Sequence, residues 1–147
     1  MSHSSLQSAR LQLIRQLVYF DEERFHFLDH YFPSDKDKRK GEMFLDEYTQ
    51  KLEHIIAHFE EDALHSVALI GSRIEMTDEG FDDSFTIVFP HQADPDRNMI
   101  SFLAPLGFQL LLSAQNDNKA IETPIGNSTV HVRNVQYVNM GEPFQQS

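Results

Sequence analysis

ADPDRNMISFLAPLG, residues 93–107, is the stretch that says most about the fold of this chain. Two prolines and a glycine surround a short apolar run, and aspartates precede that run. Aspartate followed by proline is typical of a turn, and Pro105 suits the first turn of a helix, where no backbone N–H is needed. The stretch therefore predicts a turn, a strand over Met99–Leu103 and a helix over Pro105–Ser113. A phosphate- or metal-binding loop is the alternative that the rest of the chain has to exclude.

Around this stretch, from Ser66 onward, apolar residues follow the alternation expected of strands. Clusters of Asp, Asn, Pro and Gly separate the runs and predict turns. Besides Met99–Leu103, the expected strands are Val67–Ile70, Arg73–Met76, Phe85–Phe89 and Thr129–Val138.

From residue 6 to residue 64, apolar residues instead recur at helical spacing. Pro33 ends the first helix near Phe32, because proline disfavours helix in the residue before it. Gly41 weakens a helix, so the second one is expected over Glu42–Asp62. Two such helices joined by a loop form an antiparallel hairpin with arms of about 30–40 Å.

Helices followed by strands indicate the α+β class. We expect an N-terminal antiparallel helical hairpin over residues 1–64. A mostly antiparallel β-sheet domain with one short helix should follow over residues 65–140. Residues 141–147 are expected to form a frayed tail.

The composition restricts the classes of function. The 147 residues carry 12 Lys and Arg against 23 Asp and Glu, a net charge of −11, so the surface repels nucleic acid and no direct sequence-specific binding to it is expected. No apolar run approaches the ~20 residues of a membrane span, and the N-terminus lacks a signal-peptide pattern. Without cysteine there is no disulfide, thiol nucleophile or cysteine-ligated zinc. We expect a cytoplasmic protein with no membrane contact.

Signatures of an autonomous active site are missing from the sequence, which contains no G-x-S-x-G, no P-loop and no dinucleotide fingerprint. The strongest candidate metal ligands are two histidine pairs at i, i+4 spacing: His26 with His30, and His54 with His58. In a hairpin turning near Asp37, the two pairs lie roughly 9–15 Å apart along the axis. They also fall outside the apolar stripes. We therefore expect surface histidines, no metal site, no catalytic residue and no cofactor.

The stretch at 93–107 is part of a longer ordered series. Its members are Ala93-Asp94-Pro95, Ile100-Ser101 and Ala104-Pro105-Leu106-Gly107, followed without gaps by Leu110, Leu111, Asp117, Ile121, Pro124 and Gly126. Over about residues 67–138 this series resembles the C-terminal domain of the bacterial Gre transcription factors. The helical hairpin ahead of it has the order of that family too.

The resemblance implies an FKBP-like sheet domain that is a binding module without isomerase activity. Such a domain docks on RNA polymerase at the rim of its secondary channel. The stretch at 93–107 is then a strand, a turn and a helix, and not a phosphate loop. The docking residues expected on this basis are Asp94, Pro95, Ser101, Pro105, Leu106 and Gly107.

Two features depart from the Gre pattern. Leu112 and Asn116 stand where the family usually has glycine. Asparagine tolerates left-handed backbone, whereas Leu112 indicates a repacked helix end. The tip sequence D-L-S-E-N-A-E-Y of the Gre cleavage factors is missing, and the expected tip, residues 33–42, keeps only its general acidity. The tip candidates are Asp35, Asp37, Lys38, Arg39, Lys40 and Glu42.

The tip leaves its role open. In Gre cleavage factors, tip carboxylates hold a second Mg²⁺ in the polymerase site, and oxygen ligands suit this cation. Asp35 and Asp37 supply such oxygens, but the cations within Lys36–Lys40 compete with a metal ion. Solvated loop acids are the alternative. The basic run is likewise either a solvated turn or a functional contact.

Our main hypothesis is an RNA polymerase-binding regulator near the short-hairpin, Rnk-like branch of the Gre family, with the hairpin pointing into the channel. The first alternative is a cytoplasmic scaffold protein that forms homodimers through its aromatic-rich hairpin, since these rings either form a core or cover a partner. The second is a Mg-dependent transcript cleavage factor. The aromatic residues of the hairpin are Phe20, Phe25, Phe27, Tyr31, Phe32, Phe44 and Tyr48.

Overall fold

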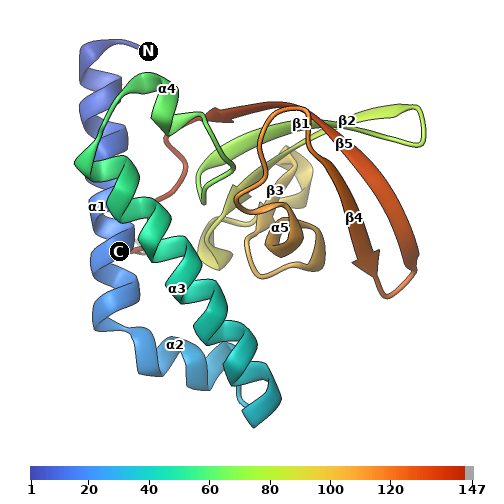
Figure 1. Ribbon diagram of the computed structural model, residues 1–147, viewed down its shortest axis with the longest axis horizontal. Coiled ribbons are helices and arrows are strands. Elements are labelled where there is room, and N and C mark those ends of the chain that lie inside the picture. The colour runs from blue at the N-terminus through green and yellow to red at the C-terminus, as the bar shows by residue number, and fades with distance from the viewer. Residues whose placement is uncertain (145–147) are drawn as a thin grey trace.

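The computed structural model describes residues 1–144, in which four helices precede a curled sheet of five strands (Figure 1). This order confirms the α+β class. The helices are α1 (His3–Glu22), α2 (Arg24–Tyr31), α3 (Asp35–Ala57) and α4 (Glu61–Leu64). The later elements are β1 (Ser72–Asp78), β2 (Phe81–Val88), η1 (Pro90–Gln92), η2 (Pro95–Arg97), β3 (Met99–Ser101), α5 (Pro105–Leu110), β4 (Asn118–Thr123) and β5 (Gly126–Tyr137).

The first arm of the hairpin consists of two helices rather than the single helix expected. Ser2 caps α1, its hydroxyl accepting a hydrogen bond of 3.2 Å from the Ser5 N–H. The helical backbone is interrupted at Glu23, where α2 turns away from the axis of α1 (Figure 1). Neither a proline nor a glycine marks this break in the sequence. The expected end of helix before Pro33 is confirmed.

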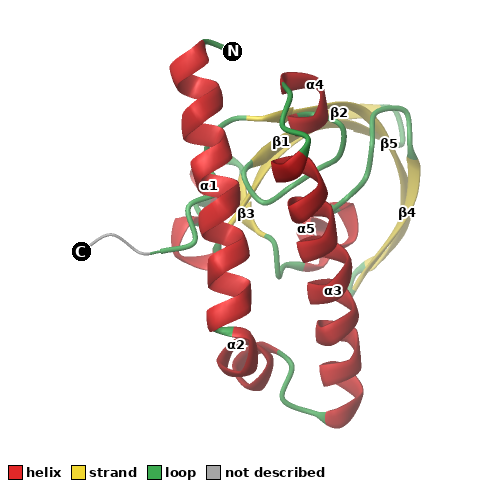
Figure 2. Cartoon of the chain, turned by 60° about the vertical axis from the view of Figure 1, so that its left-hand side comes forward, coloured by secondary structure: helices red, strands yellow, loops and turns green. Residues whose placement is uncertain are grey.

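The second arm, α3, begins well before the expected Glu42. The Ser34 hydroxyl caps it by accepting a hydrogen bond of 3.1 Å from the Asp37 N–H. Residues expected to form a loop at the tip therefore lie in the first turns of a helix, and the loop itself covers only residues 32–34 (Figure 2). At its other end α3 stops at Ala57, and α4 forms a separate turn where one continuous helix was expected.

Gly41 lies inside α3, although it was expected to delay the start of the helix. A Cβ atom at this position would lie 2.7 Å from the Leu28 side chain and 2.8 Å from the Phe32 ring. The missing side chain thus lets the end of the first arm pack closely against α3. Tertiary contact, which local propensity does not describe, explains the wrong boundary.

The strands lie in the order β3-β2-β1-β5-β4. β1 is antiparallel to both β2 and β5, β4 is antiparallel to β5, and only β2 and β3 run parallel in the described sheet. The mostly antiparallel sheet is therefore confirmed. A register shift between Glu75 and Met76 marks a bulge, which increases local twist, and the sheet curls around α5 (Figure 1).

Two expectations about strands were wrong. Residues 67–70 form no strand and instead run as a linker, in which the Ala68 N–H donates to the Ser113 carbonyl at 2.8 Å. The strand β4 was not expected at all. Ile121 is its one buried residue, so its sequence shows too little alternation to indicate a strand.

One hydrophobic core joins the hairpin to the sheet domain. The Phe20 ring of α1 lies 6.0 Å from the Phe89 ring and 6.1 Å from the Phe102 ring. Most of the hairpin aromatics thus form an internal junction; Phe25 and Tyr31 are the exposed members of that set. The members in the junction are Phe20, Phe27, Phe32, Phe44 and Tyr48. The boundary between two domains near residue 64 stays a prediction.

Residues 138–144, here called the C-terminal segment, pack against α1 instead of fraying from residue 141. The Gln12 amide donates to the Asn139 carbonyl at 2.9 Å, and the Gln16 amide donates to the Gly141 carbonyl at 2.9 Å. Gly141 is buried, and the Phe144 ring lies against α1. The rest of the expected tail, residues 145–147, lies outside the described residues.

Gln16 is completely buried and connects four segments of the chain. Besides Gly141, its amide donates to the Ile70 carbonyl of the linker at 2.8 Å. Its carbonyl oxygen accepts a hydrogen bond of 2.6 Å from the Tyr48 hydroxyl of α3. That hydroxyl in turn accepts a hydrogen bond of 2.8 Å from the Ile70 N–H. Because each polar atom has a partner, this network fixes the hairpin against the sheet domain at a low cost in desolvation.

Candidate docking surface

The α5 corner, residues 103–107, is formed by the turn that leads from β3 into α5. The Ser101 hydroxyl accepts a hydrogen bond of 3.1 Å from the Leu103 N–H, and Pro105 takes the first position of the helix as expected. Gly107 is buried, and a Cβ atom there would lie 2.5 Å from the Ser101 carbonyl oxygen. A side chain at this position would therefore push α5 away from β3.

The α5 corner reaches the protein surface. Pro105 is exposed and Leu106 is half-buried. One side of Leu106 packs on the core, and the other lines a cleft of about 350 Å³ that also contains Ile121 and Ile125. The corner thus offers a small apolar surface on a rigid helix start.

Asp94 and Pro95 lie at the opposite end of β3 from the α5 corner. The Asp94 carboxylate accepts a hydrogen bond of 3.1 Å from the Asp96 N–H and caps η2, which Pro95 opens. Asp94 and Met99 also exchange two backbone hydrogen bonds of 2.9 and 3.0 Å. Four of the six expected docking residues are therefore adjacent, and the other two form a separate turn. The adjacent four are Ser101, Pro105, Leu106 and Gly107.

The acidic tip candidates lie in the first turn of α3. Asp35 and Asp37 are both exposed, and a helix N-terminus stabilises carboxylates. Glu42 is exposed farther along the helix. The part of the chain that the structure describes contains no group of three or more His, Cys, Asp or Glu side chains arranged to hold a metal ion. Any metal at the tip would need ligands from a partner.

The basic tip candidates have different surroundings. The Lys38 ammonium lies 2.9 Å from the Asp29 carboxylate of α2, and this hydrogen bond raises the pKa of Lys38 above its ordinary value. The Lys40 ammonium lies 5.0 Å from the centre of the Phe108 ring of α5, a cation–π contact. Arg39 is exposed. The basic run is therefore partly used to hold the tip together and to join it to the sheet domain.

A groove of about 760 Å³ separates the hairpin tip from the α5 corner and is here called the tip groove. One wall comes from α2 and α3, and the other from α5 and the end of β4. It is lined by Tyr31, Phe32, Lys40, Leu103, Pro105, Phe108, Gln109, Glu122, Thr123 and Pro124. Most of these residues were not expected at a site, because no local pattern in the sequence shows that the tip lies beside α5.

Gln109 holds the far wall of the tip groove. Its amide donates to the Pro105 carbonyl at 2.8 Å and to the Glu122 carbonyl at 2.7 Å. Its side-chain oxygen accepts a hydrogen bond of 2.8 Å from the Glu122 N–H. The glutamine thus occupies the place of a neighbouring strand at the edge of β4 and fixes α5 to the sheet.

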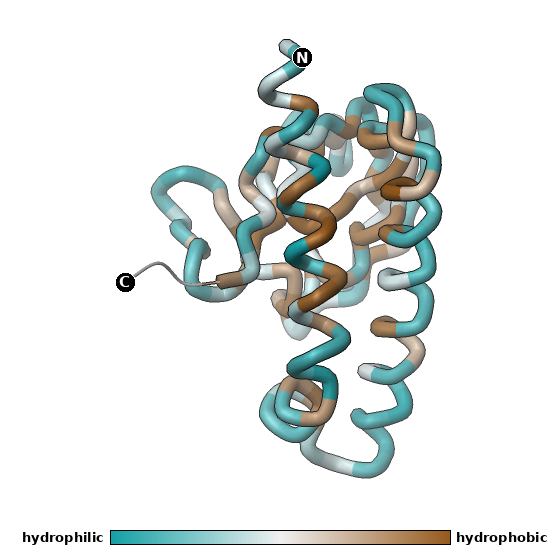
Figure 3. The backbone as a smooth tube through the Cα atoms, turned by 90° about the vertical axis from the view of Figure 1, so that its left-hand side faces the viewer, coloured by the Kyte–Doolittle hydropathy of each residue, from teal (hydrophilic) through white to brown (hydrophobic). Residues whose placement is uncertain are grey.

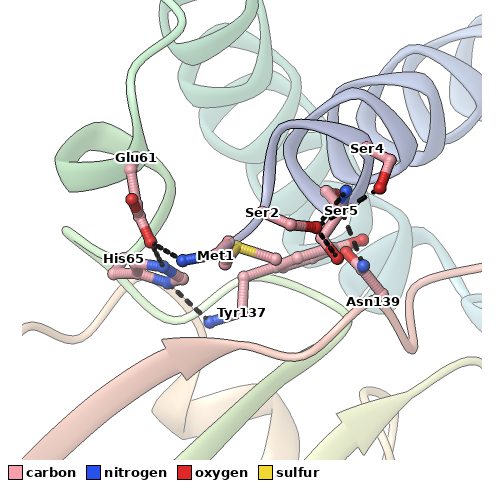
Figure 4. A network of polar contacts seen from close by, with 8 residues as sticks. All are labelled: Met1, Ser2, Ser4, Ser5, Glu61, His65, Tyr137 and Asn139. Atoms are coloured by element: carbon pink, nitrogen blue, oxygen red, sulfur yellow. Dashed lines mark hydrogen bonds and ion pairs between the residues drawn. The ribbon is translucent and has the colours of Figure 1, made fainter.

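A second polar cluster joins the start of α1 to α4 and the end of β5 (Figure 4). The His65 ring accepts a hydrogen bond of 2.9 Å from the Tyr137 N–H through Nδ1, so that Nε2 carries the proton of the neutral ring. Nε2 lies 4.0 Å from the Glu61 carboxylate, which also pairs with the Met1 amino group. Burial lowers the pKa of His65, although Glu61 opposes this shift.

The four histidines of the helical pairs are all exposed, as expected. The two rings of each pair lie on one helix face, with centres 6.2 Å apart for His26 and His30 and 4.9 Å apart for His54 and His58. Across the described part of the chain, no helix combines the length and the apolar character that a membrane span requires.

Comparison with known families decides the relationship. The family described as "Transcription elongation factor, GreA/GreB, C-term" matches residues 63–137, about half of the chain. The chain belongs to the GreA/GreB family. The matched range begins in α4 and ends with β5, so this GreA/GreB region contains the whole described sheet and the α5 corner. The resemblance found in the sequence is thereby confirmed.

Individual GreA/GreB relatives match parts of the chain. The transcription elongation factor GreA of Desulfovibrio desulfuricans is 36% identical over 64 residues, which cover 44% of this chain and 40% of that protein. The chain thus spans less than half of that relative's length. Among solved structures, the GreA factor homolog 1 (Gfh1) of Thermus thermophilus has 22% identity, covers 86% of this chain and 94% of its own, and gives a TM-score of 0.44. A GreA/GreB elongation factor from Nitrosomonas europaea has 29% identity, covers 60% and 79%, and gives 0.45.

Proposed function

We propose that this GreA/GreB family member is a cytoplasmic, non-enzymatic regulator that binds RNA polymerase. It docks through its sheet domain at the rim of the secondary channel, and its hairpin tip faces the channel. The family match to residues 63–137 supports this proposal, because it covers the domain that carries the α5 corner. The exposure of Pro105 at the start of a well-fixed helix is the observation that carries the choice of surface.

The short reach of the hairpin tip favours occlusion over action deep inside the channel. Lys40 and Phe44 of α3 both contact Phe108 of α5, so the tip is tied to the sheet domain close to the α5 corner. Asp35, the first residue of α3, lies five and nine residues away, which corresponds to about 8–14 Å of helix. A tip of this length blocks a channel mouth or competes with other channel binders. This behaviour would place the protein with the short-hairpin, Rnk-like branch.

A pull-down with core RNA polymerase tests the proposal. Wild type is expected to bind, and the variant Pro105→Ala/Leu106→Asp is expected to lose binding, because it removes the apolar surface of the α5 corner. Phe81→Asp is the matched control, since Phe81 is 79% exposed at the start of β2, away from the α5 corner. If the double variant fails to fold, the single variant Pro105→Ala is tested in its place. Failure of wild type to bind ends the proposal.

Transcript cleavage is the second candidate activity, and the two exposed carboxylates in the first turn of α3 favour it. Carboxylates at this place would have to complete a Mg²⁺ site together with polymerase residues and water. We expect no stimulation of cleavage when the protein is added to backtracked complexes, because the reach of the tip is short. Cleavage that wild type stimulates and Asp35→Asn/Asp37→Asn does not would establish this second activity instead.

A further inference from the structure

The outer face of α1 carries a line of apolar side chains that the fold does not use. Leu11 is 53% exposed and Val18 is 41% exposed. Ile14 lies between them, is half-buried, and is not among the residues that pack on the hydrophobic core. In Figure 3, α1 crosses the front of the molecule with no other element before it, and hydrophobic positions recur along it. We call Leu11, Ile14 and Val18 the outer stripe.

The outer stripe is distinct from the buried face of the same helix. At about 100° per residue, its three members fall within an arc of about 60°. The buried residues of α1 are Ala9, Leu13, Gln16 and Phe20. Their mean direction lies about 160° from that of the outer stripe by the same spacing. A single exposed leucine is ordinary on a protein surface. Three apolar residues at i, i+3 and i+7, however, form a stripe of the kind by which one helix packs against another. The helix α1 therefore has an apolar stripe on its outer face in addition to its buried face.

Charges beside the outer stripe change sign along the helix. Arg10 flanks the stripe on one side and Arg15 on the other, both in the middle part of α1. Asp21 and Glu22 continue these same two flanks at the C-terminal end of α1. Arg15 also contacts Glu142 of the C-terminal segment at 3.2 Å, with 48% of its side chain still exposed. The outer face of α1 is thus basic around residues 10–15 and acidic at residues 21 and 22, with the outer stripe running between the two charged flanks.

We propose that this face binds a second copy of the chain, with the two α1 helices antiparallel about a twofold axis. In this arrangement Arg10 of each helix faces Asp21 of the other, the twofold axis passes near residues 15–16, and the two outer stripes meet there. A parallel arrangement would place like charges together and is disfavoured. Twofold symmetry requires one self-complementary patch, and the outer face of α1 has that pattern. The surface differs from the aromatic-rich hairpin considered from the sequence, because those rings are mostly buried.

The dimer leaves the proposed polymerase contacts on another side of the molecule. α1 lies at one margin of the fold, whereas α5 lies within the curl of the sheet (Figure 1). The proposal therefore stands without the proposed function. A monomeric variant that still captures polymerase would leave that function intact and show the two surfaces to be separate.

Sedimentation velocity over a wide range of concentrations is the first test. Wild type is expected to shift toward twice the mass of one chain as concentration rises. Leu11→Asp/Val18→Asp should sediment as a monomer, with an unchanged circular dichroism spectrum, because both side chains point to solvent within one chain. Phe81→Asp, which removes an exposed ring elsewhere, should behave as wild type. A wild-type protein that stays monomeric throughout overturns the proposal.

A charge exchange tests the pairing without touching the apolar residues. Arg10→Asp alone and Asp21→Arg alone should each weaken the dimer, and the double variant should regain most of the lost association. These residues are eleven positions apart, about 16 Å along α1, so recovery reports a contact between chains. Absence of recovery overturns the antiparallel arrangement.

Introduced cysteines test the orientation directly, since the chain has none of its own. In the antiparallel pair that places Arg10 opposite Asp21, the twofold axis passes near residues 15–16, so Ile14→Cys lies about 5 Å along the axis from its own copy and should form a disulfide-linked dimer under mild oxidation. Gln7→Cys lies on the same face but near the helix end, roughly 25 Å along the axis from its copy, and should not. Efficient crosslinking at both positions would indicate a parallel pair and overturn the proposal. Crosslinking at neither would overturn the interface itself.

Discussion

A single hydroxyl group, that of Tyr48, connects both arms of the hairpin to the linker before β1. It donates to Gln16 and accepts from the Ile70 N–H, and all of these groups are buried. Burial also raises the pKa of Tyr48 well above its ordinary value, so the group stays protonated and remains a donor.

Tyr48→Phe should therefore destabilise the protein by about 1–3 kcal/mol, because the substitution leaves two buried polar atoms without a partner. Urea unfolding monitored by circular dichroism measures this loss. Tyr31→Phe removes the same atom from a side chain that is 40% exposed, and its effect should stay within about 0.5 kcal/mol. Equal effects of the two substitutions would contradict the role assigned to the network.

Leu112 is a second residue with a structural role, and this role depends on its backbone conformation. Its φ angle is +66°, in the left-handed region where the Gre pattern usually has glycine, and its N–H donates to the Ala68 carbonyl at 2.7 Å. Left-handed backbone costs a non-glycine residue roughly 1–2 kcal/mol. The side chain offsets this cost by packing partly on the core.

We expect Leu112→Gly to be more stable than Leu112→Ala by about 1 kcal/mol, because both lose the packing but only glycine relieves the backbone. Thermal unfolding of the two variants measures the difference. At Leu64, which lies in a helix and is fully buried, the same pair of substitutions should show the opposite order. An alanine variant at position 112 that is as stable as the glycine variant would argue against backbone strain.

At the scale of elements, His65 connects α4 to the end of β5 and gives the junction a dependence on pH. The folded pKa of His65 lies below its ordinary value of 6.5, because burial disfavours the charged ring. The stability from the neutral ring is complete above the unfolded pKa and is lost as pH falls from there through the folded pKa. Glu61 and Asp62 moderate the shift, and the N-terminal amino group adds to it.

We expect wild type to lose more unfolding free energy than His65→Asn between pH ~7.5 and ~5.5, around the ordinary histidine pKa. Asparagine retains an oxygen that can accept the Tyr137 N–H but does not titrate. Urea unfolding at the two pH values gives the comparison. His54→Asn is the control, since His54 is exposed and lies outside the junction of α4 with β5. An identical loss in all three proteins would remove His65 from the explanation.

The sequence predicted those elements whose ends depend on local chemistry. Pro33 ended a helix and Pro105 began one, and Asn116 adopted the left-handed backbone expected of it, with φ of +73°. Boundaries set by distant contacts were missed. Gly41 continues α3 because Leu28 and Phe32 need its space, a requirement that no window of local sequence contains.

The candidate site divides in the same way. The turn and helix start of the α5 corner were predicted, because the residues concerned follow one another in the chain. The tip groove was not, because Lys40 meets Phe108 only after the hairpin has packed on the sheet domain. Edge strand β4 contributes Glu122 to the groove. Because this strand was not expected, the wall of the groove that it helps to form could not be predicted from the sequence.

At the scale of the whole molecule, the C-terminal segment holds α1 against the sheet domain. Ending the chain after Met140 would remove the Gly141 acceptor of Gln16, the Glu142 partner of Arg15, and the Phe144 ring beside Tyr19. We expect a loss of about 2–3 kcal/mol and a melting temperature lower by about 5–10 °C. Differential scanning calorimetry measures both quantities.

Ending the chain after Phe144 provides the control, because it keeps every contact described for the segment. A truncation at 140 that melts like this control would show that the C-terminal segment adds nothing to stability.

The position of Gln12 and Gln16 has a further consequence for biosynthesis. Their partners Asn139 and Gly141 stand 127 and 125 residues later in the chain. Before the ribosome has translated these residues, α1 has emerged but these two acceptors have not been made. The C-terminal segment can therefore fix α1 only after residues 139–141 have left the ribosome, and until then the hydrophobic core alone holds α1 against the sheet domain.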